Sequence, residues 1–104
     1  MMKQYYETKM KYPEHILLFQ IGDFYEMFFE DAEAANSALG LHLIKRKTSS
    51  ASNLDGIPMC GVPVSTAEIH INRLVKAGHM VAVCDQVRLL TPVKLFCIPL
   101  PSTH

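Results

Sequence analysis

The sequence predicts an α/β (α+β) fold, a single small domain in which a mixed β-sheet is flanked by helices. The chain has 104 residues, which is enough for one compact domain and too few for two of ordinary size. Hydrophobic residues make up 49% of it, so a folded core is expected rather than disorder. Short apolar runs typical of buried strands alternate with segments of helical spacing, and this alternation favours a sheet layered with helices.

The amino-terminal segment is predicted to be helical. Polar and apolar residues alternate at helical spacing across Met2–Lys11 and place Met2, Tyr6 and Met10 on one stripe. Pro13 follows closely, and a proline commonly stands just beyond the last turn of a helix. We therefore expect this helix to end before Pro13.

A strand hairpin is expected next. The apolar run Ile16–Ile21 fits a buried strand. Gly22 and Asp23 supply a two-residue turn that begins with glycine, and a second extended segment follows at residues 24–29. The two segments together predict a hairpin with its turn at Gly22 and Asp23.

Capping residues and prolines delimit the elements in the rest of the chain. Asp31 is expected to cap a helix that runs to Leu39, with Gly40 in the left-handed position after it. The form Ser-x-x-Glu at residues 65–68 predicts a capping box at the start of another helix. The remaining expected elements are a strand over 41–44, a polar loop over 48–56, a strand over 57–62 that Pro58 and Pro63 place at an edge or bring to an end, and a buried strand over 80–84.

The second strand of the hairpin has two faces of different character, because alternate side chains of a strand point the same way. The two sets are Tyr25, Met27 and Phe29 on one face and Phe24, Glu26 and Phe28 on the other. The first set suits a core. The second places a ring beside a carboxylate, which is a poor core but a plausible reader of bases. Spacing alone leaves two interpretations open: Phe24 packs beneath a helix and Glu26 is solvated, or the pair wedges into a weakly stacked base step.

Composition and motifs exclude several classes of function. No apolar run reaches the ~18 to 20 residues of a membrane span, and the amino terminus lacks the apolar region of a signal peptide, so a cytoplasmic location without membrane contact is expected. Neither a glycine-rich phosphate loop nor a nucleophile signature is present, so we do not expect the chain to be an enzyme. The formal net charge is zero, and a domain that holds DNA by itself is usually basic. Any DNA binding by the isolated chain should therefore be weak.

The cysteines and histidines do not predict a metal site or another cofactor. Cys60, Cys84 and Cys97 are odd in number and form no C-x-x-C, so we expect buried small hydrophobic residues or bystanders. The five histidines are scattered along the chain. One enzymatic alternative stays open, a thiol- or histidine-dependent enzyme built on Cys60 or Cys84, which requires a thiol of low pKa.

The segment Gly-Asp-Phe-Tyr-Glu at residues 22–26 resembles the G-D-F-Y-E segment of the MutS family of DNA mismatch repair proteins. The similarity extends in order and spacing to I-P-M-C-G-V-P at residues 57–63 and V-A-V-C-D-Q at residues 81–86. The resemblance implies the amino-terminal mismatch-recognition domain of that family over residues 1–86. It leaves residues 87–104 as a divergent tail, expected to be truncated and less tightly docked than the rest.

The resemblance also implies roles for individual residues. Phe24 matches the phenylalanine that stacks on the mispaired base, Glu26 matches the glutamate that hydrogen-bonds that base, and Asp23 flanks both. Lys45 and Arg46 resemble a basic pair that contacts phosphates, although an ordinary solvated loop would explain them equally well.

The implied partners are mismatched double-stranded DNA and a MutS-type polypeptide with the clamp and the ATPase, since the family's ATP site is absent from this chain. The alternative is a domain that no longer engages DNA, either a remnant or a protein-interaction module.

Overall fold

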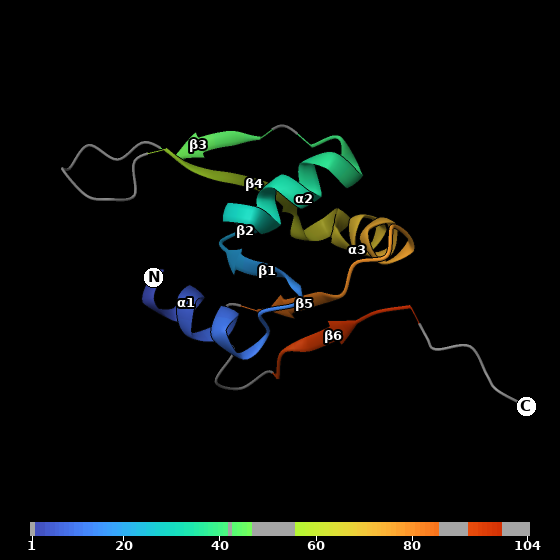
Figure 1. Cartoon of the computed structure of the whole chain (residues 1–104), viewed down its shortest axis with the longest axis horizontal. Helices are drawn as coiled ribbons and strands as arrows, with labels where there is room; N and C mark the ends of the chain where they lie inside the picture. The colour runs from blue at the N-terminus through green and yellow to red at the C-terminus, as the bar shows by residue number, and fades with distance from the viewer. Residues whose placement is uncertain (1, 42, 47–55, 86–91, 99–104) are drawn as a thin grey trace, which may run out of the picture.

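A computed structural model describes residues 2–41, 43–46, 56–85 and 92–98 of the chain. These residues form a six-stranded sheet in the order β3-β4-β2-β1-β5-β6, with helices on both of its faces (Figure 1). The elements are α1 (Met2–Lys11), β1 (Ile16–Ile21), β2 (Phe24–Phe28), α2 (Phe29–Leu39), β3 (Ile44–Arg46), β4 (Ile57–Pro63), a 3-10 turn η1 (Val64–Thr66), α3 (Ala67–Lys76), β5 (Val81–Cys84) and β6 (Lys94–Phe96). The predicted mixed sheet with flanking helices is confirmed.

The strand pairing explains why the sheet is mixed. β1 pairs with β2 in the predicted antiparallel hairpin and with β5 in a parallel arrangement, in which Ile16 lies opposite Val81. The long connection between β1 and β5 contains α2 and α3, as a parallel crossover requires. The remaining pairs, β2 with β4, β3 with β4 and β5 with β6, are antiparallel.

Two apolar clusters cover the two faces of the sheet. The cluster on the α2 and α3 side includes Leu18, Met27 and Leu74, and the cluster on the α1 side includes Tyr5 and Phe28. Because both faces are covered, residues 16–19 of β1 are all buried, with alternate side chains in alternate clusters. This arrangement accounts for the continuous apolar run in the sequence.

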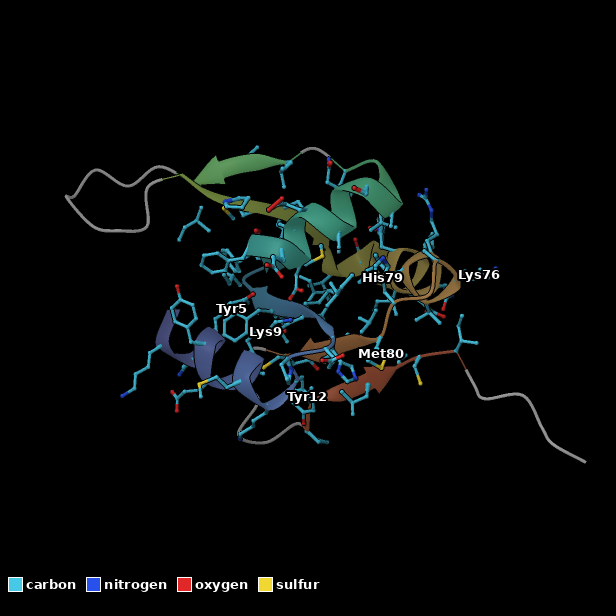
Figure 2. The ribbon with its side chains drawn as sticks, viewed as in Figure 1. Tyr5, Lys9, Tyr12, Lys76, His79 and Met80 are labelled. Carbon is cyan, nitrogen blue, oxygen red and sulfur yellow. The ribbon has the colours of Figure 1, made fainter. Side chains whose placement is uncertain are left out.

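The bounds predicted for α1 are confirmed, but its buried face is not the predicted stripe. Tyr5 and Thr8 are buried, whereas Tyr6 is exposed and Met10 is 80% exposed; the side chain of Met2 lies outside the described residues. The ring of Tyr5 packs edge-on against Phe28, with 4.9 Å between ring centroids. Figure 2 shows Tyr5 and Lys9 on the side of α1 that faces the sheet. Packing against residues far along the chain therefore decides which face is buried.

The prediction that Asp31 caps α2 is wrong. The helix begins at Phe29, so β2 ends one residue earlier than expected, and Phe29 is partly buried beside the α1-side cluster with a positive φ of 56°. Asp31 lies in the first turn of the helix, beyond the cap position, and is buried. Its Oδ2 accepts hydrogen bonds from Lys9 Nζ at 2.8 Å and from the backbone N–H of Leu17 at 3.1 Å. The Asp31 carboxylate is thus bonded to a charged donor and to a strand amide, instead of to the backbone amides at the start of α2.

The segment after α2 also differs from the prediction. Gly40 has the expected left-handed conformation, with φ of 69° and its N–H bonded to the carbonyl of Asn36. The strand predicted over 41–44 is instead β3, which begins at Ile44. Leu41 and Leu43 lie in the connecting loop and pack against the apolar cluster on the α2 and α3 side of the sheet. The predicted polar loop over 48–56 lies outside the described residues except for Gly56.

The strand over 57–62 is confirmed as β4, but it is not an edge strand. It lies between β3 and β2, and Pro58 and Pro63 stand near its two ends. The predicted capping box with Ser65 as the cap is wrong, because Ser65 lies in η1 and α3 begins at Ala67, directly after Thr66. Thr66 itself makes no side-chain cap bond to α3. Its hydroxyl instead donates to the carbonyl of Pro63 at 3.4 Å, within the turn that leaves β4.

The carboxy-terminal part of the sheet is confirmed in β5 and extended by β6. β5 is buried throughout, as predicted, but it begins at Val81, and Met80, which the prediction over 80–84 included, is exposed. β6 lies within the predicted tail and pairs with β5, but all three of its residues are exposed. Whether a domain boundary falls at residue 86 stays a prediction, and residues 86–91 and 99–104 lie outside the described part. No helix in the described ranges has the length and apolar character to cross a membrane.

Candidate nucleic-acid interface

The turn between β1 and β2 has a glycine conformation and is held by two hydrogen bonds. Gly22 adopts a left-handed conformation with φ of 62°, which a glycine accommodates without strain. The amide of Gln20 donates to the carbonyl of Gly22 at 3.1 Å, and the backbone N–H of Val64 donates to the carbonyl of Asp23 at 2.9 Å. The turn is therefore tied both to β1 and to the end of β4, and it fixes the start of β2 at Phe24.

One face of β2 passes from solvent to core within five residues. Phe24 is 46% exposed, Glu26 is partly buried, and Phe28 is fully buried beneath Tyr5. Helix α1 covers the Phe28 end of this face and leaves the Phe24 end open. Phe24 is therefore not a core residue, and the interpretation in which it packs beneath a helix does not hold.

The cross-strand neighbours define the surroundings of Phe24 and Glu26. Phe24 lies between Ile21 of β1 and Pro63 of β4. Glu26 lies between Phe19, which is buried, and Gly61, which has no side chain. The ring and the carboxylate thus stand two residues apart on one face, as the alternation predicted.

The opposite face of β2 anchors the strand. The hydroxyl of Tyr25 donates a hydrogen bond of 2.6 Å to Asp85 Oδ1. Burial, followed by this bond and by the charge of Asp85, raises the pKa of Tyr25 to about 12. Met27 is fully buried in the apolar cluster on the α2 and α3 side of the sheet. The expectation that these two residues belong to the core side is confirmed, whereas Phe29, predicted with them, is the first residue of α2.

The structure separates the predicted basic pair from Phe24. Lys45 and Arg46 belong to β3 and pair with Pro58 and Ile57 at the start of β4, whereas Phe24 pairs with Pro63 at its end. Six residues of strand span about 20 Å, and the strand between them adds roughly 10 Å across the sheet. The side chains of Lys45 and Arg46 lie outside the described residues. Asp23 is exposed in the turn beside Phe24.

Cys60 does not have the environment of a reactive thiol. Cys60 and Cys84 are buried, as predicted, and Cys97 is exposed. Burial, with a smaller contribution from the charge of Glu26, raises the pKa of the Cys60 thiol to about 11. This direction is opposite to that of a thiolate nucleophile. Among the described residues, no group of three or more histidine, cysteine or acidic side chains could hold a metal ion.

Two side-chain contacts escaped the sequence-based reasoning. Tyr25 and Asp85 are 60 positions apart, and Lys9 and Asp31 are 22 positions apart. Neither pair has a local spacing signal, because both depend on which strands and helices become neighbours. Gly61 is a third omission, and its strand-interior position was the available signal.

Comparison with known proteins places the chain in a family. The family described as MutS domain I matches residues 1–95. The chain is 51% identical over 87 residues to the DNA mismatch repair protein MutS of Chlorobium phaeobacteroides, which covers 84% of this chain and 10% of that protein. It is 52% identical over 87 residues to the DNA mismatch repair protein MutS of Anaeromyxobacter sp. strain K, covering 84% of this chain and 9% of that protein. The chain therefore belongs to the MutS domain I family, and it spans about a tenth of the length of these relatives.

Proposed function

We propose that this chain recognises mispaired or unpaired bases in double-stranded DNA, with Phe24 as the wedge and Glu26 as the hydrogen-bond partner of the displaced base. The observation that carries the proposal is the 46% exposure of Phe24 at the open end of a strand face whose far end is core. A large ring left in solvent on a rigid strand is suited to insertion between bases. The relatives named above are DNA mismatch repair proteins, and this agrees with the proposal.

Phe24 and Glu26 have different parts in this proposal: the ring supplies affinity for the duplex, and the carboxyl group supplies discrimination between bases. Stacking on an aromatic ring is indifferent to base identity, so Phe24 can accept many different mismatches. Insertion costs least where the base step is already weakly paired, so a mispair is favoured over a matched step. The carboxyl group of Glu26 accepts a hydrogen bond from a base N–H or, when protonated, donates one to a ring nitrogen.

The phosphate contacts lie elsewhere on the sheet. We assign them to Lys45 and Arg46, with Asp23 flanking the wedge in the β1–β2 turn. Since the basic pair is about 20 Å along the strand from Phe24, it would contact a different part of the duplex from the wedge. Separate contacts of this kind position the protein without reading sequence.

The neutral charge favours a partner that supplies further contacts to the phosphates. Neutralisation of phosphates supplies most of the sequence-independent affinity for DNA, and this chain has zero formal net charge. We infer that a MutS-type polypeptide with the clamp and the ATPase holds the duplex, while this domain reads it and performs no catalytic step.

Fluorescence anisotropy with short duplexes tests the proposal. Three labelled duplexes of one sequence context are compared: fully matched, with one G·T mismatch, and with one unpaired thymine. We expect weak binding to the matched duplex, a shallow dependence on salt, and tighter binding to the other two. Equal affinity for all three duplexes would instead support the alternative of a domain that no longer reads DNA.

A further inference from the structure

We propose that Gly61 is a positioning residue for Glu26, because the absence of a side chain at position 61 creates the space in which the Glu26 carboxylate lies. This inference rests on the function proposed above. It assigns a part in mismatch discrimination to a residue that need not touch DNA.

The backbone does not explain the glycine. Gly61 stands in the interior of β4, where glycine weakens a strand because it adds conformational entropy to the unfolded chain and offers no side chain to pack. The other four glycines of the chain, Gly22, Gly40, Gly56 and Gly78, all have positive φ angles, but Gly61 does not. A residue with a side chain could therefore adopt the conformation of position 61 without backbone strain.

The space above Gly61 is occupied by the carboxyl group of Glu26. A Cβ atom built on Gly61 would lie 2.8 Å from Oε1, 3.0 Å from Oε2 and 3.1 Å from Cδ of Glu26. At the other four glycines such an atom would meet nothing within 4 Å. Both carboxylate oxygens and their carbon thus lie where a side chain at position 61 would begin, and the shortest of the three distances, 2.8 Å, is below what real Cβ atoms show.

The other neighbour of Glu26 limits where the carboxylate can go. Phe19 lies opposite Glu26 on β1, is buried, and packs edge-on against Tyr5 with 5.8 Å between ring centroids. A bulky fixed ring on one side and a glycine on the other direct the Glu26 side chain over β4. Since Phe24 is two residues away on the same face, this fixes the carboxylate relative to the wedge.

A side chain at position 61 should disturb the carboxylate rather than the fold. The atoms that a methyl group would meet are the end of a flexible side chain, which can rotate away at small cost. The cost of Gly61→Ala should therefore appear in the position of the Glu26 carboxyl group, and hence in discrimination between matched and mismatched bases.

The experiment compares four forms of the whole chain: wild type, Gly61→Ala, Glu26→Ala and the double variant. Thermal unfolding reports folding. In carboxyl-¹³C-glutamate protein, the resonance assigned to Glu26 by its loss in Glu26→Ala reports the environment of the carboxylate without any DNA. Anisotropy gives the ratio of affinities for a G·T duplex and a matched duplex, with Phe24→Ala as the control for the proposed function.

We expect Gly61→Ala to retain the wild-type melting temperature or exceed it, to shift the Glu26 resonance, and to lower the affinity ratio to that of Glu26→Ala. The double variant should show no further loss. An unshifted resonance in Gly61→Ala would overturn the inference, as would an equal loss of the ratio in the Glu26→Ala background.

Two further outcomes separate the possible failures. If Gly61→Ala fails to fold, the double variant decides: folding restored by removal of Glu26 supports the contact, and continued failure refutes it. If wild type and Phe24→Ala both lack any mismatch preference, the proposed function fails, while the resonance still tests the contact between Gly61 and Glu26.

Discussion

The hydroxyl of Tyr25 donates a 2.6 Å hydrogen bond to Asp85, the residue that follows β5. Tyr25 belongs to β2, and β1 lies between β2 and β5 in the sheet, so the bond spans the strand between them. In sequence Tyr25 stands between Phe24 and Glu26, but its side chain is in the core cluster on the opposite face. The bond therefore holds β2 on the face opposite to Phe24 and Glu26, the residues proposed to read the base.

Replacement of Tyr25 by phenylalanine should lower the free energy of unfolding by about 1 to 3 kcal/mol, because the carboxylate of Asp85 loses a hydrogen bond in a partly buried site. Urea unfolding of the two proteins measures the difference. Tyr6→Phe is the matched control, since the side chain of Tyr6 is exposed and its change should stay within ~0.5 kcal/mol. Equal effects of the two substitutions would show that the bond to Asp85 adds no stability.

The same substitution should also flatten the loss of stability in alkaline solution. Burial, with the bond to Asp85, raises the pKa of Tyr25 from 10.0 to about 12, so the folded state favours the neutral phenol. The contribution of Tyr25 is therefore complete below pH 10 and is lost as the pH rises towards 12. Burial and the charge of Asp31 also raise the pKa of Tyr5, so the alkaline slope of Tyr25→Phe should be smaller but not zero.

The elements that the sequence predicted well are those with local signals. The continuous apolar run of β1 and the glycine at position 40 are each recognisable within a few residues, and both are confirmed. The buried face of α1 was not predictable in this way, because it depends on the packing of Tyr5 against Phe28. The role of Asp31 was not predictable from local sequence either. Its partners Lys9 and Leu17 are distant in the chain, and this is why Asp31 was wrongly assigned as a cap.

The candidate site shows the same division. Strand alternation predicted that Phe24 and Glu26 share a face, and the structure confirms that geometry. Strand alternation could not predict how far α1 extends over this face. That extent leaves Phe24 exposed while Phe28 is buried. The contact between Glu26 and Gly61 required the register of β2 against β4, which no local pattern gives.

Replacement of Asp31 by asparagine should cost about 2 to 3 kcal/mol of stability, because one carboxylate oxygen accepts from both Lys9 and the backbone of Leu17. The loss should appear as a lower urea midpoint. Glu33→Gln, on an exposed position of the same helix, should change stability by less than ~0.5 kcal/mol. If Asp31→Asn and Glu33→Gln have the same urea midpoint, the contacts of Asp31 do not link α1, β1 and α2 structurally.

Alkylation at neutral pH should modify Cys97 first and Cys60 far more slowly. Cys97 is exposed, whereas Cys60 is buried and burial raises its thiol pKa to about 11, so little thiolate exists at pH 7. Peptide mapping after timed treatment with iodoacetamide gives the two rates, and the same treatment of urea-unfolded protein gives the intrinsic rates. Preferential reaction of Cys60 in the folded protein would revive the alternative of a thiol-dependent enzyme.

Replacement of Glu26 by alanine should separate affinity from specificity. Removing a negative charge near phosphates relieves repulsion, so binding to matched DNA should hold or strengthen while the preference for mismatched DNA shrinks. Glu68→Ala is the control, because it removes the same charge from an exposed position of α3, on the other side of the sheet. Anisotropy with matched and G·T duplexes measures both quantities. A uniform loss of binding to both duplexes would contradict the assignment of Glu26 as a reader of the base.

Replacement of Phe24 by alanine should remove mismatch preference and leave the fold intact. The loss of one stack on a base should weaken binding to a G·T duplex by about 1 to 3 kcal/mol. The same strand face supplies the matched control: Phe28→Ala removes an identical ring that is fully buried and should cost about 3 to 5 kcal/mol of stability. Urea unfolding and anisotropy on both variants therefore give opposite expected patterns for two phenylalanines four residues apart. If Phe24→Ala instead unfolds the domain as Phe28→Ala does, Phe24 supports the core and the wedge assignment is wrong.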